Sequence, residues 1–341
     1  MVSEPLPNLA SVLAAHGLTG VVEEPMRHDG WSGASLARLT RRDGARFVLK
    51  RDSLARDWIA RETDDVPGLR EALLVAARPN LPAPLRLPHL AVARDGTDTV
   101  LLMPDLGESL ITWEAPIEVE VADRVIRALA ALHGRPWQAQ LAPSFPWTDL
   151  RRRILLVTRR AAARYEAQGL PVGEHFRHGW DAFDRFATGP ARDLVAWINA
   201  DPEPLVAALG RLPAVGLHGD LKLGNVGLEP GDDGAVYLLD WQMTLVAPAP
   251  VELGWFLVAN VAGLPLTPDA VLERYRIAAG KLADEQWGAL RDLTIVLGLV
   301  MRGWRKGLDA QAGLVLPHGP TAGDDLAWWS GEAVEAARRR L

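Results

Sequence analysis

Residues 215–225 read VGLHGDLKLGN, and they contain the most informative motif of this 341-residue chain. An apolar run that ends in His-Gly-Asp is typical of a buried strand that stops at a loop, because glycine permits a tight backbone path that bulkier residues resist. Such a loop would present Asp220 to a cleft. Asn225 follows in the same loop, close enough to face the same cleft.

The residues after this loop predict a β-hairpin. Residues 226–239 form two short apolar runs that are separated by the turn sequence EPGDDG. A short hairpin returns the chain to where it left, so we expect Asp240 to lie beside Asn225. The oxygen-bearing side chains of these two residues and of Asp220 would then converge.

The three side chains suit phosphoryl transfer. Asn225 and Asp240 are hard oxygen ligands of the kind that Mg²⁺ accepts when nucleotide phosphates and waters complete its octahedron. Asp220 would be free to accept the proton of a substrate hydroxyl, and the order Asp, Asn, Asp matches the kinase template. Each residue alone is more typical of a turn, a cap or a strand end. All three at this spacing favour a phosphoryl-transfer site.

The motif HGDLKLGN at residues 218–225, followed by LLDW at 238–241, resembles the aminoglycoside phosphotransferase and choline kinase family of small-molecule kinases. The resemblance implies an α+β, protein-kinase-like fold of two lobes. The smaller N-lobe, residues 1–103, would contain an antiparallel sheet, and the larger, mainly helical C-lobe would span residues 104–341. The implied cofactors are ATP or GTP and Mg²⁺.

Residues 21–52 are predicted to form strands, and Asp43-Gly44 is a strong hairpin marker. The connection at residues 28–35, HDGWSGAS, could fold over nucleotide phosphates. Its small residues would expose backbone N–H donors at close range. The candidate phosphate-binding residues there are Gly30, Ser32 and Gly33. An ordinary turn is the alternative interpretation.

Lys50 ends the run Phe47-Val48-Leu49-Lys50, which matches the strand that carries the phosphate-binding lysine of kinases. The alternative is a solvated lysine at a strand end. Two glutamates compete to pair with this lysine. Glu71 is favoured because it lies among helix-forming residues with an apolar face, whereas Glu62 precedes the helix-breaking residues 63–68.

A linker follows the N-terminal strands. Strands at residues 90–93 and 99–103 complete a mostly antiparallel sheet, and Pro104-Asp105-Leu106-Gly107 connects it to the rest of the chain. The family resemblance makes this linker the hinge, whose backbone holds the nucleotide base while a side chain near Met103 flanks it. Met103, Asp105 and Leu106 are therefore the nucleotide-binding candidates in this region.

The rest of the chain has helical periodicity. Residues 119–133 form a helix that ends at Gly-Arg-Pro, and its last residue, His133, is expected to be a packed structural histidine. His218 is expected to orient the catalytic loop. A helix within residues 148–168 carries six arginines that are predicted to form a solvated polar face, with a clamp for an anionic acceptor as the alternative. The arginines are Arg151, Arg152, Arg153, Arg159, Arg160 and Arg164.

The acidic residues near the motif and the position of Lys222 give indications about the class of acceptor. Residues 201–260 carry eight acidic and two basic side chains, a field that would suit a cationic acceptor. Lys222 lies two residues after Asp220, where its ammonium could reach the transferring phosphoryl group. Glu252 stands where the family commonly has an Asp-Leu-Ala segment, and is a departure. No Ala-Pro-Glu motif or long activation segment follows Asp240, which disfavours a regulated protein kinase.

Composition excludes several classes of protein. The chain has no cysteine, so disulfides and thiolate sites are ruled out. Its net charge of −6 argues against nucleic acid as a partner. The first residues lack a basic lead and a long apolar run, so neither a signal peptide nor a membrane span is expected, and a cytoplasmic location is the default.

The sequence therefore predicts an ATP- and Mg-dependent O-phosphotransferase that acts on a small-molecule hydroxyl. The acceptor classes left open are an aminoglycoside or other antibiotic, a sugar or amino sugar, and a choline-like alcohol. Residues 137–205 are expected to decide among them. The alternatives are a nucleotide-binding pseudokinase or adaptor and, less favoured, a protein kinase.

Overall fold

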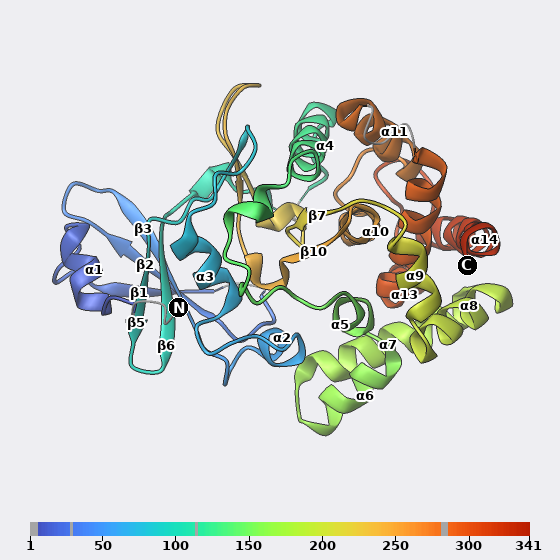
Figure 1. Ribbon diagram of the computed structural model, residues 1–341, viewed down its shortest axis with the longest axis horizontal. Helices are drawn as coiled ribbons and strands as arrows, with labels where there is room; N and C mark the ends of the chain where they lie inside the picture. The colour runs from blue at the N-terminus through green and yellow to red at the C-terminus, as the bar shows by residue number, and fades with distance from the viewer. Residues whose placement is uncertain (1–5, 28–29, 113–114, 281–285) are drawn as a thin grey trace.

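The computed structural model describes residues 6–27, 30–112, 115–280 and 286–341. His28 and Asp29, which open the predicted phosphate loop, lie outside these ranges. The first part of the chain forms a five-stranded antiparallel sheet in the order β1-β2-β3-β6-β5 (Figure 1), as predicted. The strands are β1 (Glu23–Met26), β2 (Ser35–Thr40), β3 (Arg46–Asp52), β5 (Ala91–Asp95) and β6 (Asp98–Pro104).

Side chains of β3 point alternately to the two faces of this sheet, and each face is covered by a helix. Phe47 and Leu49 pack with Val12 of α1 (Leu9–Ala15), whereas Val48 packs in a separate cluster with Val75 of α3 (Arg70–Ala77). Figure 1 shows the two helices on opposite sides of the sheet. Because side chains alternate with a period of two along a strand, Lys50 points to the same face as Val48, toward α3.

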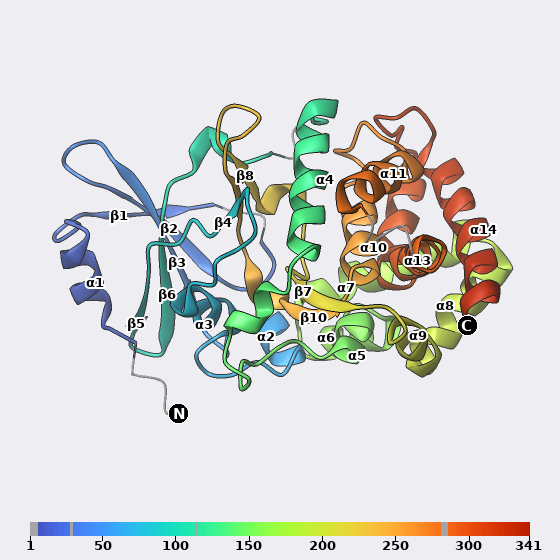
Figure 2. The same ribbon diagram turned by 45° about the horizontal axis from the view of Figure 1, so that its top comes forward.

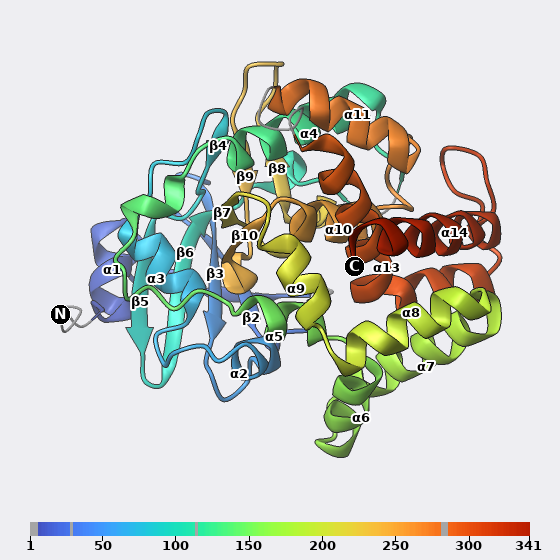
Figure 3. The same ribbon diagram turned by 45° about the vertical axis from the view of Figure 1, so that its right-hand side comes forward.

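The remainder of the chain is mainly helical. Its longest helix, α13, packs against α7, α10 and α14 (Figure 3). This small antiparallel sheet followed by a mainly helical part confirms the predicted α+β class. Among the described residues, no helix combines the length and apolar character that crossing a bilayer requires. The helices are α4 (Val119–His133), α5 (Leu150–Leu155), α6 (Arg159–Ala167), α7 (Pro171–Phe186), α8 (Gly189–Ala200), α9 (Glu203–Leu209), α10 (Pro250–Ala259), α11 (Pro268–Ala279), α13 (Trp287–Gln311) and α14 (Ala322–Arg340). A short helix, α2 (Trp58–Glu62), precedes α3.

The prediction of one arginine-rich helix within residues 148–168 is wrong in two respects. The segment forms two helices, α5 and α6, because Thr158 accepts a hydrogen bond from the N–H of Ala161 and thereby starts a second helix. In addition, Arg153 is fully buried, although the other five arginines are exposed as expected.

Two small sheets connect the N-terminal sheet to the helical part. Strand β4 (Leu85–Arg86) pairs with β9 (Val236–Leu238), which forms the predicted hairpin with β8 (Val226–Leu228) (Figure 2). Strand β7 (Ala214–Leu217) pairs with β10 (Leu245–Pro248). The hairpin is therefore held against the segment that follows α3. The lobe boundary between residues 103 and 104 remains a prediction.

Candidate active site

The loop after β7 positions Asp220. Gly219 adopts a φ of +87°, and a Cβ atom there would lie 2.0 Å from the carbonyl oxygen of Met243, so no other residue fits. The turn at this glycine brings Asp220 to the end of the strand, where its side chain is almost fully buried. The loop therefore depends on the close approach of the segment that leads into β10.

His218 orients this loop, as predicted. Its Nε2 donates a hydrogen bond to the carbonyl oxygen of Leu239 at 2.7 Å, and its Nδ1 lies 3.3 Å from the backbone nitrogen of Asp220. A neutral imidazole can donate from one nitrogen and accept at the other, so both contacts are satisfied at once. His218 thus connects the catalytic loop to the strand that delivers Asp240.

Glu252 braces the same loop from α10. Its carboxylate accepts hydrogen bonds from the backbone N–H groups of Gly219, at 2.6 Å, and His218, at 3.2 Å. Burial opposes ionisation of this group, but hydrogen bonds, chiefly from His133, hold the pKa of Glu252 below its ordinary value. The residue that departs from the family pattern therefore has a defined structural role, which sequence reasoning did not identify.

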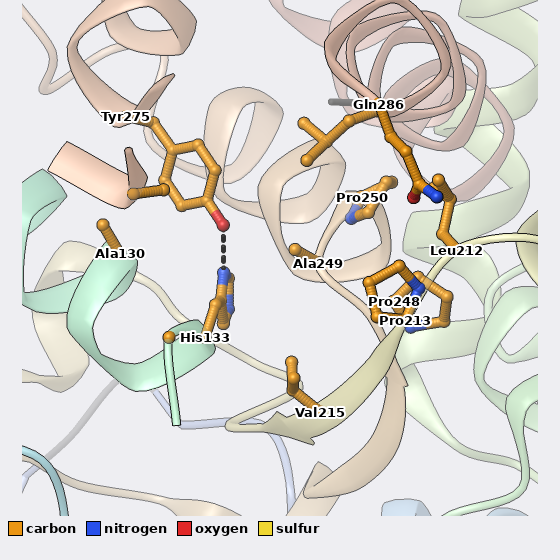
Figure 4. A pocket seen from close by; sticks show the side chains of 13 residues that line it. Ala130, His133, Leu212, Pro213, Val215, Pro248, Ala249, Pro250, Tyr275 and Gln286 are labelled. Carbon is orange, nitrogen blue, oxygen red and sulfur yellow. Dashed lines mark hydrogen bonds between the residues drawn. The ribbon is translucent and has the colours of Figure 1, made fainter. Parts of the chain in front are cut away.

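His133 is a buried structural histidine, as expected. Its Nε2 contacts Glu252 at 2.9 Å, and its Nδ1 contacts the hydroxyl of Tyr275 at 2.9 Å. Figure 4 shows the Tyr275 hydroxyl pointing at the His133 ring, at the edge of a small apolar pocket. The chain of contacts runs from Tyr275 through His133 and Glu252 to the loop backbone.

The Asp220 carboxylate is held at both oxygens. Oδ1 accepts a hydrogen bond from Nε1 of Trp255 at 2.8 Å, and Oδ2 lies 2.9 Å from Nζ of Lys222. The indole fixes the direction of the carboxylate, while the lysine supplies a positive charge beside it. Trp255 was not predicted to be a site residue, because no pattern distinguishes it from the other twelve of the 13 tryptophans.

Lys50 joins the N-terminal sheet to the hairpin strand. Its Nζ lies 2.6 Å from Oε2 of Glu71 and 2.8 Å from Oδ1 of Asp240. Burial disfavours the charge, but Asp240 and then Glu71 outweigh burial and raise the pKa of Lys50 well above its ordinary value. The competing carboxylate, Glu62, instead pairs with Arg164.

Asp240 is held ionised. Burial alone would raise the pKa of Asp240, but Lys50 and Lys222 lower it far below its usual range. Its backbone is left-handed, with φ 65° and ψ 62°, a conformation that aspartate tolerates better than most residues. The hairpin brings Asp240 back to Asn225, since the N–H of Leu239 donates to the Asn225 carbonyl oxygen at 2.9 Å.

The donor atoms here suit Mg²⁺. Nδ2 of Asn225 donates to the carbonyl oxygen of Asp220 at 2.9 Å, which leaves the amide oxygen Oδ1 available as a ligand. The ionised carboxylate of Asp240 is the second hard oxygen donor. Within the described ranges, no group of three or more His, Cys, Asp or Glu side chains could hold a metal by itself. These two residues fit a metal whose remaining ligands come from phosphates and water.

A cavity of about 420 Å³ brings most of the predicted residues together. The predicted residues that line it are Gly30, Ser32, Lys50, Glu71, Met103, Asp105, Leu106, Lys222, Asn225 and Asp240. Gly33 does not line the cavity. Its φ is +102°, and a Cβ atom there would lie 2.7 Å from the carbonyl oxygen of Arg56, so it shapes the loop by close packing. Asp220 lies next to the cavity and not in its wall.

Asp105 has structural contacts at the linker. Its carboxylate accepts from Nε of Arg38 at 2.8 Å and from the N–H of Gly107 at 3.1 Å. Its own N–H donates to the carbonyl oxygen of Arg46 at 3.0 Å. Asp105 therefore anchors the linker to the sheet, which leaves its carbonyl oxygen as the group that could contact a nucleotide base.

Arg153 is a second residue that sequence reasoning missed. Its Nε and Nη2 donate to the carbonyl oxygen of Gly219 at 3.0 and 2.7 Å, and its guanidinium carbon lies 3.9 Å from the ring centroid of Trp255. It supports the catalytic loop from α5. The run of three arginines at 151–153 was visible in the sequence, but the buried member could not be distinguished from its exposed neighbours.

Comparison with known proteins gives one family and a set of related folds. The model of the phosphotransferase enzyme family matches residues 27–293. Among curated proteins, no sequence matches. Similar solved structures include an ethanolamine kinase from Plasmodium vivax, at 11% identity, covering 97% of this chain and 87% of that chain with a TM-score of 0.53.

Two further solved structures are similar over almost their whole lengths. A macrolide 2'-phosphotransferase from Brachybacterium faecium is 19% identical, covers 95% of this chain and 97% of its own, and has a TM-score of 0.50. The GDP complex of aminoglycoside 2'-phosphotransferase-IIIa is 12% identical, with coverage of 96% and 95% and a TM-score of 0.50. At these identities the likeness establishes the fold, which is the kinase-like architecture that the sequence predicted.

Proposed function

The chain belongs to the phosphotransferase enzyme family, and we propose that it transfers the terminal phosphoryl group of ATP or GTP, with Mg²⁺, to a hydroxyl of a small molecule. The contact that carries this proposal is the bridge from Lys50 to both Glu71 and Asp240, at the edge of a cavity of about 420 Å³. A lysine braced by a helical glutamate beside an aspartate after a hairpin strand is the phosphate and metal arrangement of kinases.

Lys50 would bind the nucleotide phosphates, and Glu71 would hold its ammonium in place. Asn225 and Asp240 would hold the metal, since each offers a hard oxygen that faces the cavity. Mg²⁺, when bound, neutralises charge on the phosphates. Gly30, Ser32, Met103 and Leu106 would surround the nucleotide, because all of them line the same cavity. In this proposal the lobe boundary lies between residues 103 and 104.

Asp220 would accept the proton of the acceptor hydroxyl. The hydroxyl oxygen forms a bond to the γ-phosphorus as the bond from that phosphorus to the β–γ bridging oxygen breaks, and the nucleoside diphosphate leaves. The proton passes to the Asp220 carboxylate. Trp255 and Lys222, at 2.8 and 2.9 Å from its two oxygens, would keep the carboxylate correctly directed.

The alternatives are a nucleotide-binding adaptor and a protein kinase. An adaptor is disfavoured, because every polar position that the chemistry requires is occupied by a competent side chain. The deciding measurement is nucleotide consumption, together with ³¹P NMR of the products, over a panel of alcohols and a generic polypeptide acceptor. Phosphate on a small molecule is expected. Phosphate on polypeptide, or nucleotide binding without any transfer, would contradict the proposal.

A further inference from the structure

Arg302 interrupts the longest helix beside the predicted base. Its backbone, with φ −136° and ψ 16°, is the non-helical residue inside α13. A kink without proline needs a local cause, and irregular turns inside a long helix are frequent at functional sites. The side chain of Arg302 is about nine-tenths buried, with 9% of its surface exposed.

One indole ring separates Arg302 from Asp220. The guanidinium carbon of Arg302 lies 4.2 Å from the ring centroid of Trp255. The Nε1 of the same indole donates to Oδ1 of Asp220 at 2.8 Å. A group bound at Arg302 would therefore lie within a small molecule's length of the base.

The guanidinium of Arg302 has no hydrogen-bond acceptor. In the described part of the chain its guanidinium forms no hydrogen bond or ion pair, and its Nε is enclosed without an acceptor. The nearby acids on α13 and α14 are already used, because Asp309 pairs with Arg305 at 2.9 Å and Asp325 with Lys306 at 2.5 Å. The charge of Asp220 favours the Arg302 cation but supplies no acceptor for its N–H groups. A buried guanidinium without acceptors is costly to maintain, and an anionic ligand would supply them.

Two further nitrogen atoms beside Arg302 also lack partners. Nε2 of His175 and Nε1 of Trp304 are enclosed and form no hydrogen bond among the described residues. The ring of Trp304 lies 5.3 Å from that of His175 and 5.2 Å from the Arg302 guanidinium carbon. Burial and then the positive charges of Arg305 and other neighbours lower the pKa of His175, so it is neutral and can donate one hydrogen bond.

This donor-rich region adjoins the loop that covers the nucleotide cavity. Trp31, between Gly30 and Ser32, packs edge-on against His175 with ring centroids 4.5 Å apart. The region is therefore bounded by the nucleotide loop and by the indole that holds Asp220. An acceptor must lie between these two features for its hydroxyl to reach both the base and the γ-phosphate.

The acidic surplus of residues 201–260 does not reach this region. Glu203 pairs with Arg151, Glu229 bonds to Tyr237, and Glu252 is used by the loop backbone. Asp201 accepts a hydrogen bond from the N–H of Glu203, and Asp232 and Asp233 lie exposed in the hairpin turn. Of the eight acids, only Asp220 and Asp240 therefore remain at the site, and they are assigned to the proton and the metal, so the surplus does not by itself favour a cationic acceptor.

We propose that the acceptor carries an oxyanion, a carboxylate or a phosphate monoester, which Arg302 binds while Asp220 accepts the proton from its hydroxyl. The proposal rests on the phosphotransferase function proposed above and names the substrate class. His175 and Trp304 would donate the remaining hydrogen bonds. Charge-assisted hydrogen bonds of this kind are worth roughly 1.5–3 kcal/mol, equivalent to about 10- to 150-fold in affinity.

Matched acceptors test the proposal. Glucose, glucosamine, gluconate and glucose 6-phosphate share one hydroxylated carbon chain and differ in charge, as do glycerol, glycerate and glycerol 3-phosphate. For each we would measure kcat/KM with Mg-ATP and binding by calorimetry in the presence of Mg-ADP. The kcat/KM of at least one oxyanion member should exceed that of its neutral counterpart by about tenfold or more. Comparing the carboxylates with the phosphate monoesters shows which of the two anions is bound.

Variants then assign the preference to Arg302. R302Q should abolish the oxyanion preference and R302K should retain part of it, while R305Q, on the same helix, should leave the preference unchanged. Circular dichroism and thermal unfolding confirm that each variant folds.

A preference for glucosamine or for neutral members, failure to bind any oxyanion member, or an oxyanion preference that survives in R302Q would overturn the proposal. Transfer to neutral alcohols alone would refute only this inference, whereas no transfer to any alcohol, with or without binding of Mg-ADP, would refute the proposed function itself.

Discussion

Lys50 and Asp240 are separated by 190 positions in the chain, yet Nζ of the lysine lies 2.8 Å from Oδ1 of the aspartate. The bond connects the N-terminal sheet to the hairpin strand of the helical part. Because Glu71 holds the other side of the same ammonium, two negative charges depend on one cation. This arrangement keeps the proposed metal ligand Asp240 beside the lysine that would bind phosphate.

Replacing Lys50 by methionine is expected to weaken both stability and nucleotide binding. The variant leaves the buried carboxylate of Glu71 and the partly buried carboxylate of Asp240 without their shared cation, which is expected to cost about 3 kcal/mol in the free energy of unfolding. The measurement is urea unfolding, together with the thermal shift produced by Mg-ATP. Arg41→Met is the control, because it removes an exposed ion pair with Asp43 and should change neither quantity measurably. An unchanged thermal shift in Lys50→Met would show that the lysine does not bind the nucleotide.

Asp220→Asn is expected to reduce kcat by about 10² to 10⁴ and to leave nucleotide affinity nearly unchanged. An asparagine oxygen can still accept the hydrogen bond from Trp255, so the loop should keep its conformation, but the amide cannot take up a proton. Steady-state kinetics and calorimetric titration with Mg-ADP separate the two effects. If nucleotide affinity falls in parallel with turnover, Asp220 has a structural role and is not the base.

Much of this site could be predicted because its signals are local. The motif at residues 218–225 is contiguous, and the family match over residues 27–293 confirms the resemblance that it indicated. The hairpin of residues 226–239 needs only a turn and two short apolar runs. Glu71 could be preferred to Glu62 from the apolar face of its helix and from the helix-breaking residues that follow Glu62, and Glu71 is the glutamate that contacts Lys50.

The parts that could not be predicted depend on contacts between distant segments. Arg153 and Arg302 are buried because α5 and α13 pack around Trp255, and nothing in their own sequence neighbourhood marks them as different from exposed arginines. The pairing of β4 with β9 joins two-residue and three-residue strands that are too short to carry a pattern. Glu252 was noticed only as a departure, since its role depends on the backbone of a loop more than thirty positions earlier.

Glu252→Gln is expected to destabilise the protein and to slow turnover. The glutamine amide can direct only one oxygen toward the donors of Gly219, His218 and His133, so at least one buried N–H loses its acceptor. An unsatisfied buried donor costs about 1–3 kcal/mol, and the catalytic loop loses part of its support. Urea unfolding and kcat report these two effects.

Tyr275→Phe is the matched control for the Glu252 variant. It removes the hydroxyl that contacts His133 and leaves the hydrogen bonds between Glu252 and the loop intact. The loss of stability should be smaller than in Glu252→Gln, and kcat should stay close to that of the parent protein. Equal losses in the two variants would mean that the histidine contact, and not the loop contact, is what Glu252 provides.

The stability of the protein should fall as pH rises through neutrality, because of two buried carboxylates near Lys50. Burial, and then repulsion by Asp52, raises the pKa of Asp57 to about 8, and burial raises the pKa of Asp52 to about 6. The ordinary value is 3.8. At a pH between the ordinary pKa and these raised pKa values, each carboxyl group keeps its proton in the native state but has lost it in the unfolded chain. The free energy of unfolding therefore decreases as the pH increases from about 4 to about 8.

Asp57→Asn tests this pH dependence without removing a helix cap. Asp57 accepts hydrogen bonds from the N–H groups of Ile59 and Ala60 at the start of α2, and asparagine caps helices about as well as aspartate. The variant should therefore lose the part of the pH slope that Asp57 causes, with its largest gain in stability over the parent at pH 8. Asp149→Asn, an exposed cap of α5, is the control and should leave the slope unchanged. Urea unfolding at several pH values between 5 and 8 measures the slopes. If Asp57→Asn and the parent have the same slope, Asp57 is already ionised in the native state, and the backbone N–H donors outweigh its burial.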